Sequence, residues 1–372
     1  MTPTLSTKTD ELILWLKRSA LPLWWNVGAD HARGGFFEAL DHQGKPVQAN
    51  RRARVQARQI YVYATAGDLG WDGPWQDAVE HGLDFFLKNY LRPDGLFRTI
   101  VAPDGQAVDD RAWLYDQAFA LFATAQAARV LPGRSDLRAT AHSLIEAIQS
   151  WRLTEGGFEE PPAVFNYQSN PHMHLLEASL AWAEIDDHPV WRATADHLVD
   201  LALSKFIDER GALHEFFAPG WARAAGIDGR IIEPGHQFEW AWLLERWARL
   251  RNRDDAHLAA LRMFKIGAAW GLDKERGVAT QQLLDDGSIH DDVARLWPQT
   301  ELIKASVIMA DPAQASTAID GLKLYLDKPV PGTWWDKLHP DGSWVDEPAP
   351  ASSFYHIICA IAELSAAPRA IE

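Results

Sequence analysis

The stretch GTWWDKLHPDG, residues 332–342, starts with glycine, continues with aromatic residues that favour extended structure and ends in Asp-Gly. Five similar stretches precede it: GGFFEALDHQG at 34–44, DGLFRTIVAPDG at 94–105, GGFEEP at 156–161, GALHEFFAPG at 211–220 and GVATQQLLDDG at 277–287. One glycine marks each repeat: Gly35, Gly95, Gly157, Gly211, Gly277 and Gly332. These markers are 60, 62, 54, 66 and 55 residues apart, which predicts six similar units.

Segments with apolar residues at helical spacing lie between these stretches, usually two to a unit. One such pair is RAWLYDQAFALFATAQAARVL at 111–131 and SDLRATAHSLIEAIQSW at 135–151. The whole pattern predicts about twelve helices, near 8–25, 51–69, 75–90, 110–130, 135–152, 170–185, 189–205, 236–251, 254–270, 292–309, 311–327 and 352–366.

Six helical hairpins can stack as an open solenoid or close into a ring. A solenoid needs polar capping repeats, but the first and last helices, ELILWLKRSALPLWW at 11–25 and SSFYHIICAIAEL at 352–364, are among the most apolar. We therefore expect an all-α fold, an (α/α)6 barrel with short β-hairpin-like loops at one mouth. The chain contains no low-complexity linker, so residues 1–372 are expected to form one domain. The loops and inner helix starts at that mouth should form the functional cleft.

The composition excludes several classes of function. A formal charge of −15 without a large basic cluster disfavours nucleic acid and anionic membranes as partners. No window reaches the roughly 20 apolar residues of a membrane-spanning helix. The single cysteine, Cys359, and an N-terminal sequence that carries acids and lysines predict a cytoplasmic protein. The 18 tryptophans suit both a large core and the stacking of sugar rings, and an exposed one could also serve a homodimer contact.

The segment NPHMHLLEASLAW at 170–182 carries a polar stripe on an otherwise apolar helix. Asn170, His174 and Glu177 lie at i, i+4 and i+7 and so share one face, whereas His172 points elsewhere. This stripe indicates either a cleft wall or a core histidine bonded to its own helix.

In EPGHQFEWAW at 233–242, His236 and Glu239 share a face just after the helix start marked by Pro234 and Gly235. The helix N-terminus favours the neutral imidazole, whereas the carboxylate favours the charged one. An imidazole between these influences can titrate near neutrality, as a general acid or base requires.

Further polar side chains interrupt apolar helices in the other units. Because unpaired buried charge is costly, each must find a partner or face a wet cleft. They are Arg58 in QARQIYVYATA, Tyr115 and Asp116 in WLYDQAFALFA, Trp297 and Glu301 in RLWPQTELIKA, and His356 in the last helix, which alone could equally be a core residue.

Taken in order, these segments resemble the N-acylglucosamine 2-epimerase family, which includes cellobiose 2-epimerases and mannose isomerases. The resemblance covers nearly the whole chain and depends on the order and spacing of the segments. It implies an (α/α)6 barrel that interconverts sugars by proton transfer at the carbon next to the carbonyl, with no metal and no cofactor.

The resemblance also implies roles for individual residues. Arg58 resembles the arginine that holds sugar oxygens near the carbonyl, and His236 and His356 resemble the catalytic pair. Glu239 and His174 resemble the polar groups that contact the open-chain sugar and set the histidines. Trp242, Trp297 and Glu301 resemble disaccharide-binding residues of cellobiose epimerases, whose substrate need not transfer. Further expected substrate contacts are Asn170, Glu177, Tyr115 and Asp116.

The chemistry suits these residue types. Removing a proton next to a carbonyl makes an enediolate, which needs a base near neutrality and a cation beside the developing oxyanion. One base that returns the proton to carbon 1 gives aldose–ketose isomerisation, and two bases on opposite faces give 2-epimerisation. The segment 332–357 looks most like mannose isomerases, so we expect a free monosaccharide as substrate, of the D-mannose to D-fructose type, with 2-epimerisation as the alternative.

Three other functions stay open at this point. A glycoside hydrolase could pair Asp116 with Glu239 or Glu301. A metal enzyme could recruit His172, His174 and Glu177, although residues at i and i+2 of a helix point about 200° apart. A carbohydrate-binding scaffold would bind sugar without turnover.

Overall fold

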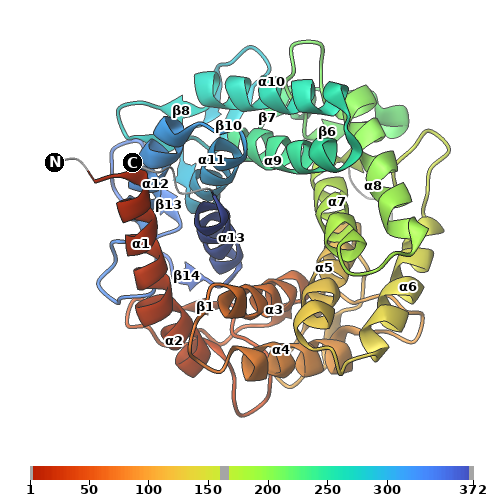
Figure 1. Cartoon of the computed structure of the whole chain (residues 1–372), viewed down its shortest axis with the longest axis vertical. Coiled ribbons are helices and arrows are strands. Elements are labelled where there is room, and N and C mark those ends of the chain that lie inside the picture. The colour runs from red at the N-terminus through yellow and green to blue at the C-terminus, as the bar shows by residue number, and fades with distance from the viewer. Residues whose placement is uncertain (1–2, 160–166, 368–372) are drawn as a thin grey trace.

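The computed structural model describes residues 3–159 and 167–367, and its helices form two concentric rings (Figure 1). The inner ring consists of α3 (Ala53–Asp68), α5 (Leu114–Val130), α7 (Ser169–Ala183), α9 (Pro234–Arg251), α11 (Leu296–Ile308) and α13 (Ser352–Ala366). The outer ring consists of α1 (Leu5–Trp15) with α2 (Leu21–Leu23), α4 (Trp75–Tyr90), α6 (Asp136–Gln149), α8 (Pro189–Leu201), α10 (Asp254–Trp270) and α12 (Pro312–Leu326). The predicted (α/α)6 barrel is confirmed.

The two rings differ in how their helices are buried. Outer helices such as α4 bury one face and expose the other, as amphipathic helices do. Inner helices are covered on nearly all sides: 12 residues of α11 are buried. A polar side chain on an inner helix therefore has only two environments available, a hydrogen-bonded core position or the interior of the ring.

Hydrogen bonds close the ring between its first and last units. Gln59 of α3 donates to the carbonyl of Ala351, just before α13, at 2.8 Å, and Ala351 N donates to Glu38 O at 2.9 Å. The strands β1 (Ala39–Leu40) and β14 (Ala349–Pro350) pair in the same region. The first and last units of the chain therefore lie side by side, which an open solenoid would not allow.

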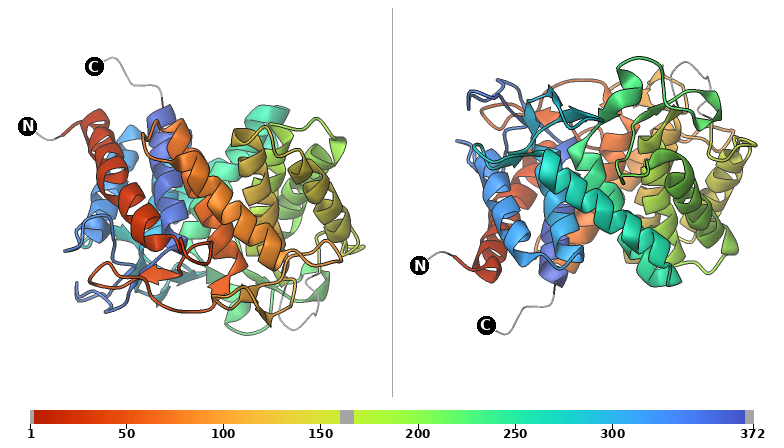
Figure 2. Two further views of the ribbon diagram at one scale, coloured as in Figure 1. Left: turned by 90° about the horizontal axis from the view of Figure 1, so that it is seen from below. Right: turned by 90° about the horizontal axis from the view of Figure 1, so that it is seen from above.

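The strands are short and gather at one end of the ring (Figure 2). Most strands that directly precede an inner helix pair antiparallel with the loop of the next unit: β2 with β3, β5 with β6, β7 with β10, β12 with β13, and β14 with β1. These and the other strands are β2 (Arg51–Arg52), β3 (Ile100–Val101), β4 (Ala107–Asp109), β5 (Tyr167–Gln168), β6 (Phe216–Phe217), β7 (Ile231–Ile232), β8 (Leu272–Asp273), β9 (Val278–Ala279), β10 (Gln282–Leu284), β11 (Ile289–Asp291), β12 (Ala294–Arg295) and β13 (Lys337–Leu338). The pairing links the loops into a mouth.

A buried side chain on the first turn of most inner helices holds the loop before it. Gln56 accepts from Phe36 N and donates to Phe36 O, both at 2.8 Å. The same double hydrogen bond joins Gln117 to Phe97, Gln237 to Leu213 and Gln299 to Ala279, and His172 accepts from Phe158 N. Because these residues occupy the same helical position in each unit, the loops are fixed to the inner ring in the same way.

The repeat stretches predicted from sequence form these loops, except that residues 160 and 161 lie outside the described residues. All six marker glycines have positive φ, between 69° and 97°, a backbone region that other residues seldom adopt. The helix boundaries agree with prediction in most units. The prediction of helix at residues 110–113 and 292–295 is wrong. The chain is not helical there, and β12 pairs with β13.

Ten of the 18 tryptophans are buried, and most of these belong to the continuous hydrophobic core. Trp182 and Trp191, for example, stack between an inner and an outer helix with ring centroids 5.2 Å apart. Among the residues described, no helix has both the length and the apolar character needed to cross a membrane.

Replacing Gln56 by Leu should destabilise the fold, because Phe36 N–H and C=O would lose their buried partner. We expect the free energy of unfolding to fall by about 1–3 kcal/mol, measured by denaturant titration. Gln76→Leu on the exposed face of α4 is the matched control and should change it by less than about 0.5 kcal/mol. Equal stability of the two variants would contradict the anchoring role.

Candidate active site

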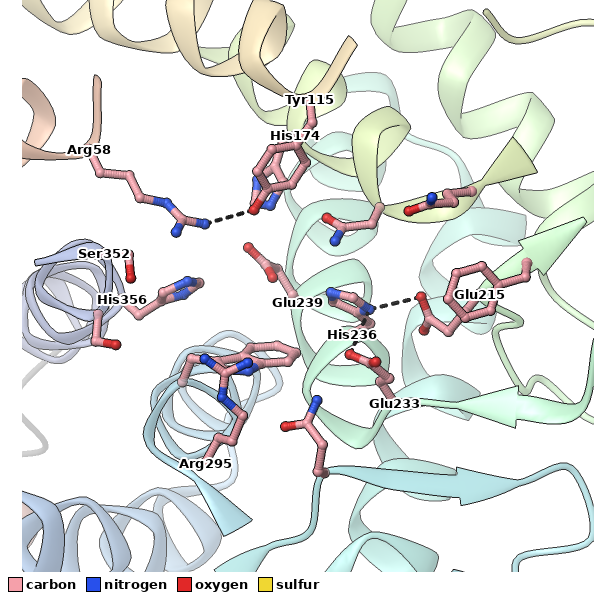
Figure 3. Close-up of a pocket in the computed structure, with 16 residues that line it drawn as sticks. Arg58, Tyr115, His174, Glu215, Glu233, His236, Glu239, Arg295, Ser352 and His356 are labelled. Carbon is pink, nitrogen blue, oxygen red and sulfur yellow. Dashed lines mark hydrogen bonds and ion pairs between the residues drawn. The ribbon is translucent and has the colours of Figure 1, made fainter. Parts of the chain in front are cut away.

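A cavity of about 280 Å³ opens at the mouth where the inner helices begin (Figure 3). All six inner helices contribute to its wall. The lining residues are Arg58, Tyr115, Gln168, Asn170, His174, Glu215, Phe216, Glu233, His236, Glu239, Gln281, Arg295, Trp297, Ser352, Ser353 and His356. Because helix N-termini carry partial positive charge, their convergence favours a ligand on which negative charge develops.

Arg58 lies one turn into α3 and is 7% exposed. Its Nη2 donates to Tyr115 Oη at 3.0 Å, and the guanidinium lies 4.5 Å from the centre of the Phe119 ring. Its Nε has no hydrogen-bond partner, and no carboxylate among residues 3–159 and 167–367 forms an ion pair with it. The positive charge is therefore available to an oxygen in the cavity.

His236 is held by two carboxylates. Its Nδ1 lies 2.9 Å from Glu215 Oε2 and 3.4 Å from Glu233 Oε2. Burial alone lowers the pKa of His236, but the charges of Glu215 and Glu233 outweigh it and raise the pKa to about 10. His236 is thus an imidazolium at neutral pH, and Nε2 is its nitrogen left for a ligand.

His356 differs from His236 in its protonation state. Its Nδ1 donates to Glu301 Oε1 at 2.9 Å, while Glu301 Oε2 forms an ion pair with Lys304 Nζ at 2.6 Å. Burial, with the nearby charges of Arg58 and Lys304, holds the pKa of His356 well below its usual value. The imidazole is therefore neutral, and the hydrogen bond at Nδ1 assigns the lone pair to Nε2.

The indole of Trp297 lies beside both histidines. The ring centroids are 5.0 Å from His236 and 5.9 Å from His356. Gly235 makes this position possible, because a Cβ there would come within 2.3 Å of the Trp297 ring. The indole thus fills the wall that joins the two imidazoles.

His174 and Glu177 form a second histidine–carboxylate pair deeper in the ring. His174 Nδ1 lies 3.2 Å from Glu177 Oε2, and Tyr355 donates to Glu177 Oε1 at 2.5 Å. Burial lowers the pKa of His174 to about 4, so the imidazole is neutral. Burial by itself raises the pKa of Glu177, but the hydrogen bonds from His174 and Tyr355 keep it ionised. The predicted orientation of His172 away from this face is confirmed, since it bonds the loop instead.

Glu239 lies between these pairs and is 1% exposed. Burial, followed by the charge of Glu301, raises its pKa to about 8. Its Oε1 has no hydrogen-bond partner. A carboxyl group that is largely protonated at neutral pH can donate as well as accept a hydrogen bond.

The cavity wall carries several buried polar atoms without a partner. They are Arg58 Nε, Asn170 Oδ1, Glu215 Oε1, Glu239 Oε1, Gln281 Oε1 and Arg295 Nε. Buried polar groups are normally hydrogen-bonded, so this cluster of donors and acceptors fits a ligand rich in hydroxyl groups.

The structure brings together most of the site residues predicted from sequence. Arg58, His174, His236, Glu239 and His356 line one cavity, as do Asn170, Tyr115 and Trp297. Glu177 and Glu301 do not line it, because they lie behind His174 and His356 as their hydrogen-bond partners.

Two predicted substrate contacts lie elsewhere. Asp116 points between helices, where it is fully buried against Arg54 and Thr99. Trp242 lines a separate cavity of about 510 Å³ among the C-terminal halves of inner helices, because it comes two turns after His236 along α9. The predicted substrate contacts of Asp116 and Trp242 are therefore wrong, and so is the pairing of Asp116 with Glu239 or Glu301 across one cleft.

Sequence reasoning missed five charged or amide residues of the cavity: Gln168, Glu215, Glu233, Gln281 and Arg295. All five lie on the mouth loops and short strands and not on inner helices. Glu215 and Glu233 were part of the quoted stretches GALHEFFAPG and EPGHQFEWAW, and acids in the mouth loops were the available signal.

Within the part of the chain that the structure describes, two groups of side chains could hold a metal ion: His174 with Glu177 and Glu239, and Glu239 with Glu301 and His356. However, the ammonium of Lys304 already supplies positive charge beside Glu301. Both histidines also use Nδ1 for a carboxylate. The donor set suits hydrogen-bonded pairs, and the absence of a metal stays a prediction.

Comparisons with known proteins agree with the fold and identify the family. The profile of the N-acylglucosamine 2-epimerase (GlcNAc 2-epimerase) family matches residues 35–360. The chain belongs to this family, and it is an enzyme of the isomerase and epimerase class. It is 46% identical over 370 residues to a mannose-6-phosphate isomerase from Rhizobium meliloti (strain 1021), covering 95% of this chain and 96% of the relative.

Solved structures of the same fold include two sugar-converting enzymes. Cellobiose 2-epimerase from Spirochaeta thermophila DSM 6192 superposes with a TM-score of 0.87 at 22% identity, covering 98% of this chain and 97% of that one. A D-mannose isomerase superposes with a TM-score of 0.86 at 18% identity, covering 96% and 97%. At these identities the likeness establishes the fold.

The three histidines of the cavity should titrate differently. His236 should keep its proton through neutral pH and lose it near pH 10, whereas His174, with a pKa of about 4, and His356, with a pKa well below its usual value, should be neutral at pH 7. Imidazole ¹⁵N chemical shifts across this pH range measure each one, with His236→Asn and His356→Asn spectra for assignment. Titration of His236 between pH 6 and 7 would contradict the double carboxylate contact.

The ion pairs of His236 with Glu215 and Glu233 should make the free energy of unfolding depend on pH. Because the pKa of His236 is raised on folding from about 6.5, its contribution to stability is complete below about pH 6.5. That contribution is lost as the pH rises through about 10. Glu233→Gln should weaken this dependence.

Proposed function

We propose that this protein interconverts a free aldohexose and its ketohexose, of the D-mannose to D-fructose type. One observation carries the proposal: an imidazolium and a neutral imidazole line one small polar cavity, with an unpaired guanidinium beside them. Proton transfer next to a carbonyl needs a base, an acid and a cation for the oxyanion. At about 280 Å³ the cavity lies at the small end of ligand sites and suits a single hexose.

The reaction follows from the charge states. Neutral His356 accepts the proton from carbon 2 of the open-chain aldose, while the imidazolium of His236 protonates the carbonyl oxygen and Arg58 stabilises the developing negative charge. These steps are then reversed at the neighbouring carbon of the enediol. His356 returns the proton to carbon 1, and His236 takes the proton of the carbon 2 hydroxyl, which leaves a ketose. Delivery of a proton to the opposite face of carbon 2 would give 2-epimerisation, the alternative outcome of the same site.

The charges of the cavity favour an unphosphorylated sugar. Glu215 and Glu233 are engaged with the imidazolium of His236, and the guanidinium of Arg295 already binds Asp336 at 3.2 Å, which leaves Arg58 as the cation for the carbonyl end of the sugar. A hexose 6-phosphate is the second candidate substrate, favoured by the name of the 46% identical relative and by the unpartnered Nε of Arg295. A cytoplasmic location belongs to this proposal, supported by a single buried and unpaired cysteine, Cys359.

Incubation with D-mannose in deuterated water should produce D-fructose with deuterium at carbon 1, read by NMR. Formation of D-glucose with deuterium at carbon 2, without D-fructose, would instead identify an epimerase. Parallel reactions with D-mannose 6-phosphate should be at least about tenfold lower in kcat/KM, and dialysis against EDTA should leave the rate unchanged. Absence of turnover with all of these sugars would refute the proposal.

His236→Asn and His356→Asn should each lower kcat by about 10²–10⁴-fold, the usual effect of removing a general acid or base. Steady-state kinetics measure the loss, and circular dichroism checks that the helices remain. His172→Asn is the matched control, because His172 binds a loop and does not line the cavity. A catalytic variant that retains more than about a tenth of the activity would remove that histidine from the mechanism.

A further inference from the structure

Glu215 is held at a fixed position beside His236. Its Oε2 accepts hydrogen bonds from His236 Nδ1 at 2.9 Å and from Ser169 Oγ at 3.1 Å. Its main-chain carbonyl accepts from Ser169 N at 3.1 Å, directly before the pairing of β5 and β6. The side chain is 4% exposed, so its carboxylate has little freedom to turn.

The second oxygen of this carboxylate has no hydrogen-bond partner among residues 3–159 and 167–367. Glu215 Oε1 is buried without a hydrogen bond, and Glu215 belongs to the wall of the cavity. A buried carboxylate oxygen without a hydrogen-bond donor destabilises the unliganded site. A donor from the ligand would remove that destabilisation, since the ionised group can only accept hydrogen bonds.

Glu233 provides the contrast within the same site. It also faces His236 Nδ1, at 3.4 Å, but its Oε1 already accepts a hydrogen bond from Gln282 Nε2 at 2.8 Å. Both acids therefore raise the pKa of His236. Of the two, Glu215 is the one with an oxygen that lacks a hydrogen-bond partner among the described residues. Glu233 is a natural control for the charge of Glu215.

The position of Glu215 indicates which part of a sugar it would meet. Figure 3 shows Arg58 and His356 on one side of the cavity and Glu215 on the other, beyond His236. If the carbonyl end of the sugar lies by Arg58, the hydroxyls of carbons 4 to 6 extend toward Glu215.

We propose that Glu215 has two roles in the reaction: one oxygen orients His236, and the other accepts a hydrogen bond from a hydroxyl at carbons 4 to 6 of the open-chain sugar. This inference rests on the proposed function and extends it to the recognition of the far end of the substrate. The contact makes one hydroxyl a requirement for turnover. It also places a negative charge where a 6-phosphate would lie.

The test removes the Glu215 side chain from the protein and, separately, one hydroxyl from the sugar. In the wild type, one of 4-deoxy-D-mannose and 6-deoxy-D-mannose should have a kcat/KM about 10- to 150-fold below that of D-mannose, as expected for a hydrogen bond to a charged group. In Glu215→Ala the same hydroxyl deletion should cost less than about threefold, whereas Glu233→Gln should retain the full penalty. A penalty that persists in Glu215→Ala overturns the contact.

The orienting role needs a readout of its own. Glu215→Gln keeps the shape of the side chain but removes its charge, so the alkaline limb of the pH profile of kcat/KM should move to lower pH. Glu233→Gln should move it in the same direction. An unmoved limb in Glu215→Gln, with the fold intact by circular dichroism, overturns the role in setting His236.

A binding experiment separates this inference from the proposed function. D-mannitol is an open-chain hexitol that cannot react, and calorimetry measures its affinity whether or not the wild type converts any sugar. Glu215→Ala should weaken D-mannitol binding by at least about tenfold, and Glu233→Gln should weaken it much less. Equal affinities of the two variants would overturn the hydroxyl contact, even if mannose isomerisation is demonstrated.

Discussion

The hydrogen bond from Gln59 to the carbonyl of Ala351 joins two parts of the chain that are 292 residues apart. It connects the first inner helix to the start of the last one and, with the pairing of β1 and β14, turns a row of six helical hairpins into a closed ring. Arg58 precedes Gln59, and His356 lies one turn after Ala351. The guanidinium and the neutral imidazole therefore face one cavity only because the ring is closed.

The anchoring glutamines extend this constraint to the loops. An inner helix begins at the mouth, and the loop before it must return there from an outer helix. The double hydrogen bond to that loop fixes its distance from the helix start, and positive φ at the marker glycine lets the chain turn within it. The acids on such loops, Glu215 and Glu233, thereby lie at defined distances from His236, which belongs to a helix. The geometry of the site thus combines rigid helices with loops that are hydrogen-bonded to them.

The sequence predicted the ring because its signals are local. Helical periodicity, turn residues and the repeat interval are all visible within about 60 residues. The misassigned residues include short non-helical segments before α3, α5 and α11, of which Arg51–Arg52 and Ala294–Arg295 form strands. The histidines and Arg58 were predicted to line the site because they are polar residues on apolar inner helices. The same signal failed for Asp116, because polarity does not tell which side of a helix a residue occupies. Trp242, which was assigned through the family resemblance, lies too far along α9 to reach the cavity. Glu215 and Glu233 were missed, since a loop acid is ordinary until the fold places it against an imidazole.

The two catalytic histidines show how neighbouring charge gives one residue type two functions. Each donates Nδ1–H to a buried carboxylate, so the hydrogen bond alone cannot distinguish them. The surroundings differ: Glu301 forms an ion pair with Lys304, whereas Glu215 is joined at His236 by a second acid, Glu233, and neither of these two acids forms an ion pair with a lysine or arginine among residues 3–159 and 167–367. His236 therefore keeps its proton and His356 does not. Burial, the guanidinium of Arg58 and the ammonium of Lys304 together lower the pKa of His356 and leave it as the imidazole that can act as a base, so the acid–base pair is a property of the whole charge network.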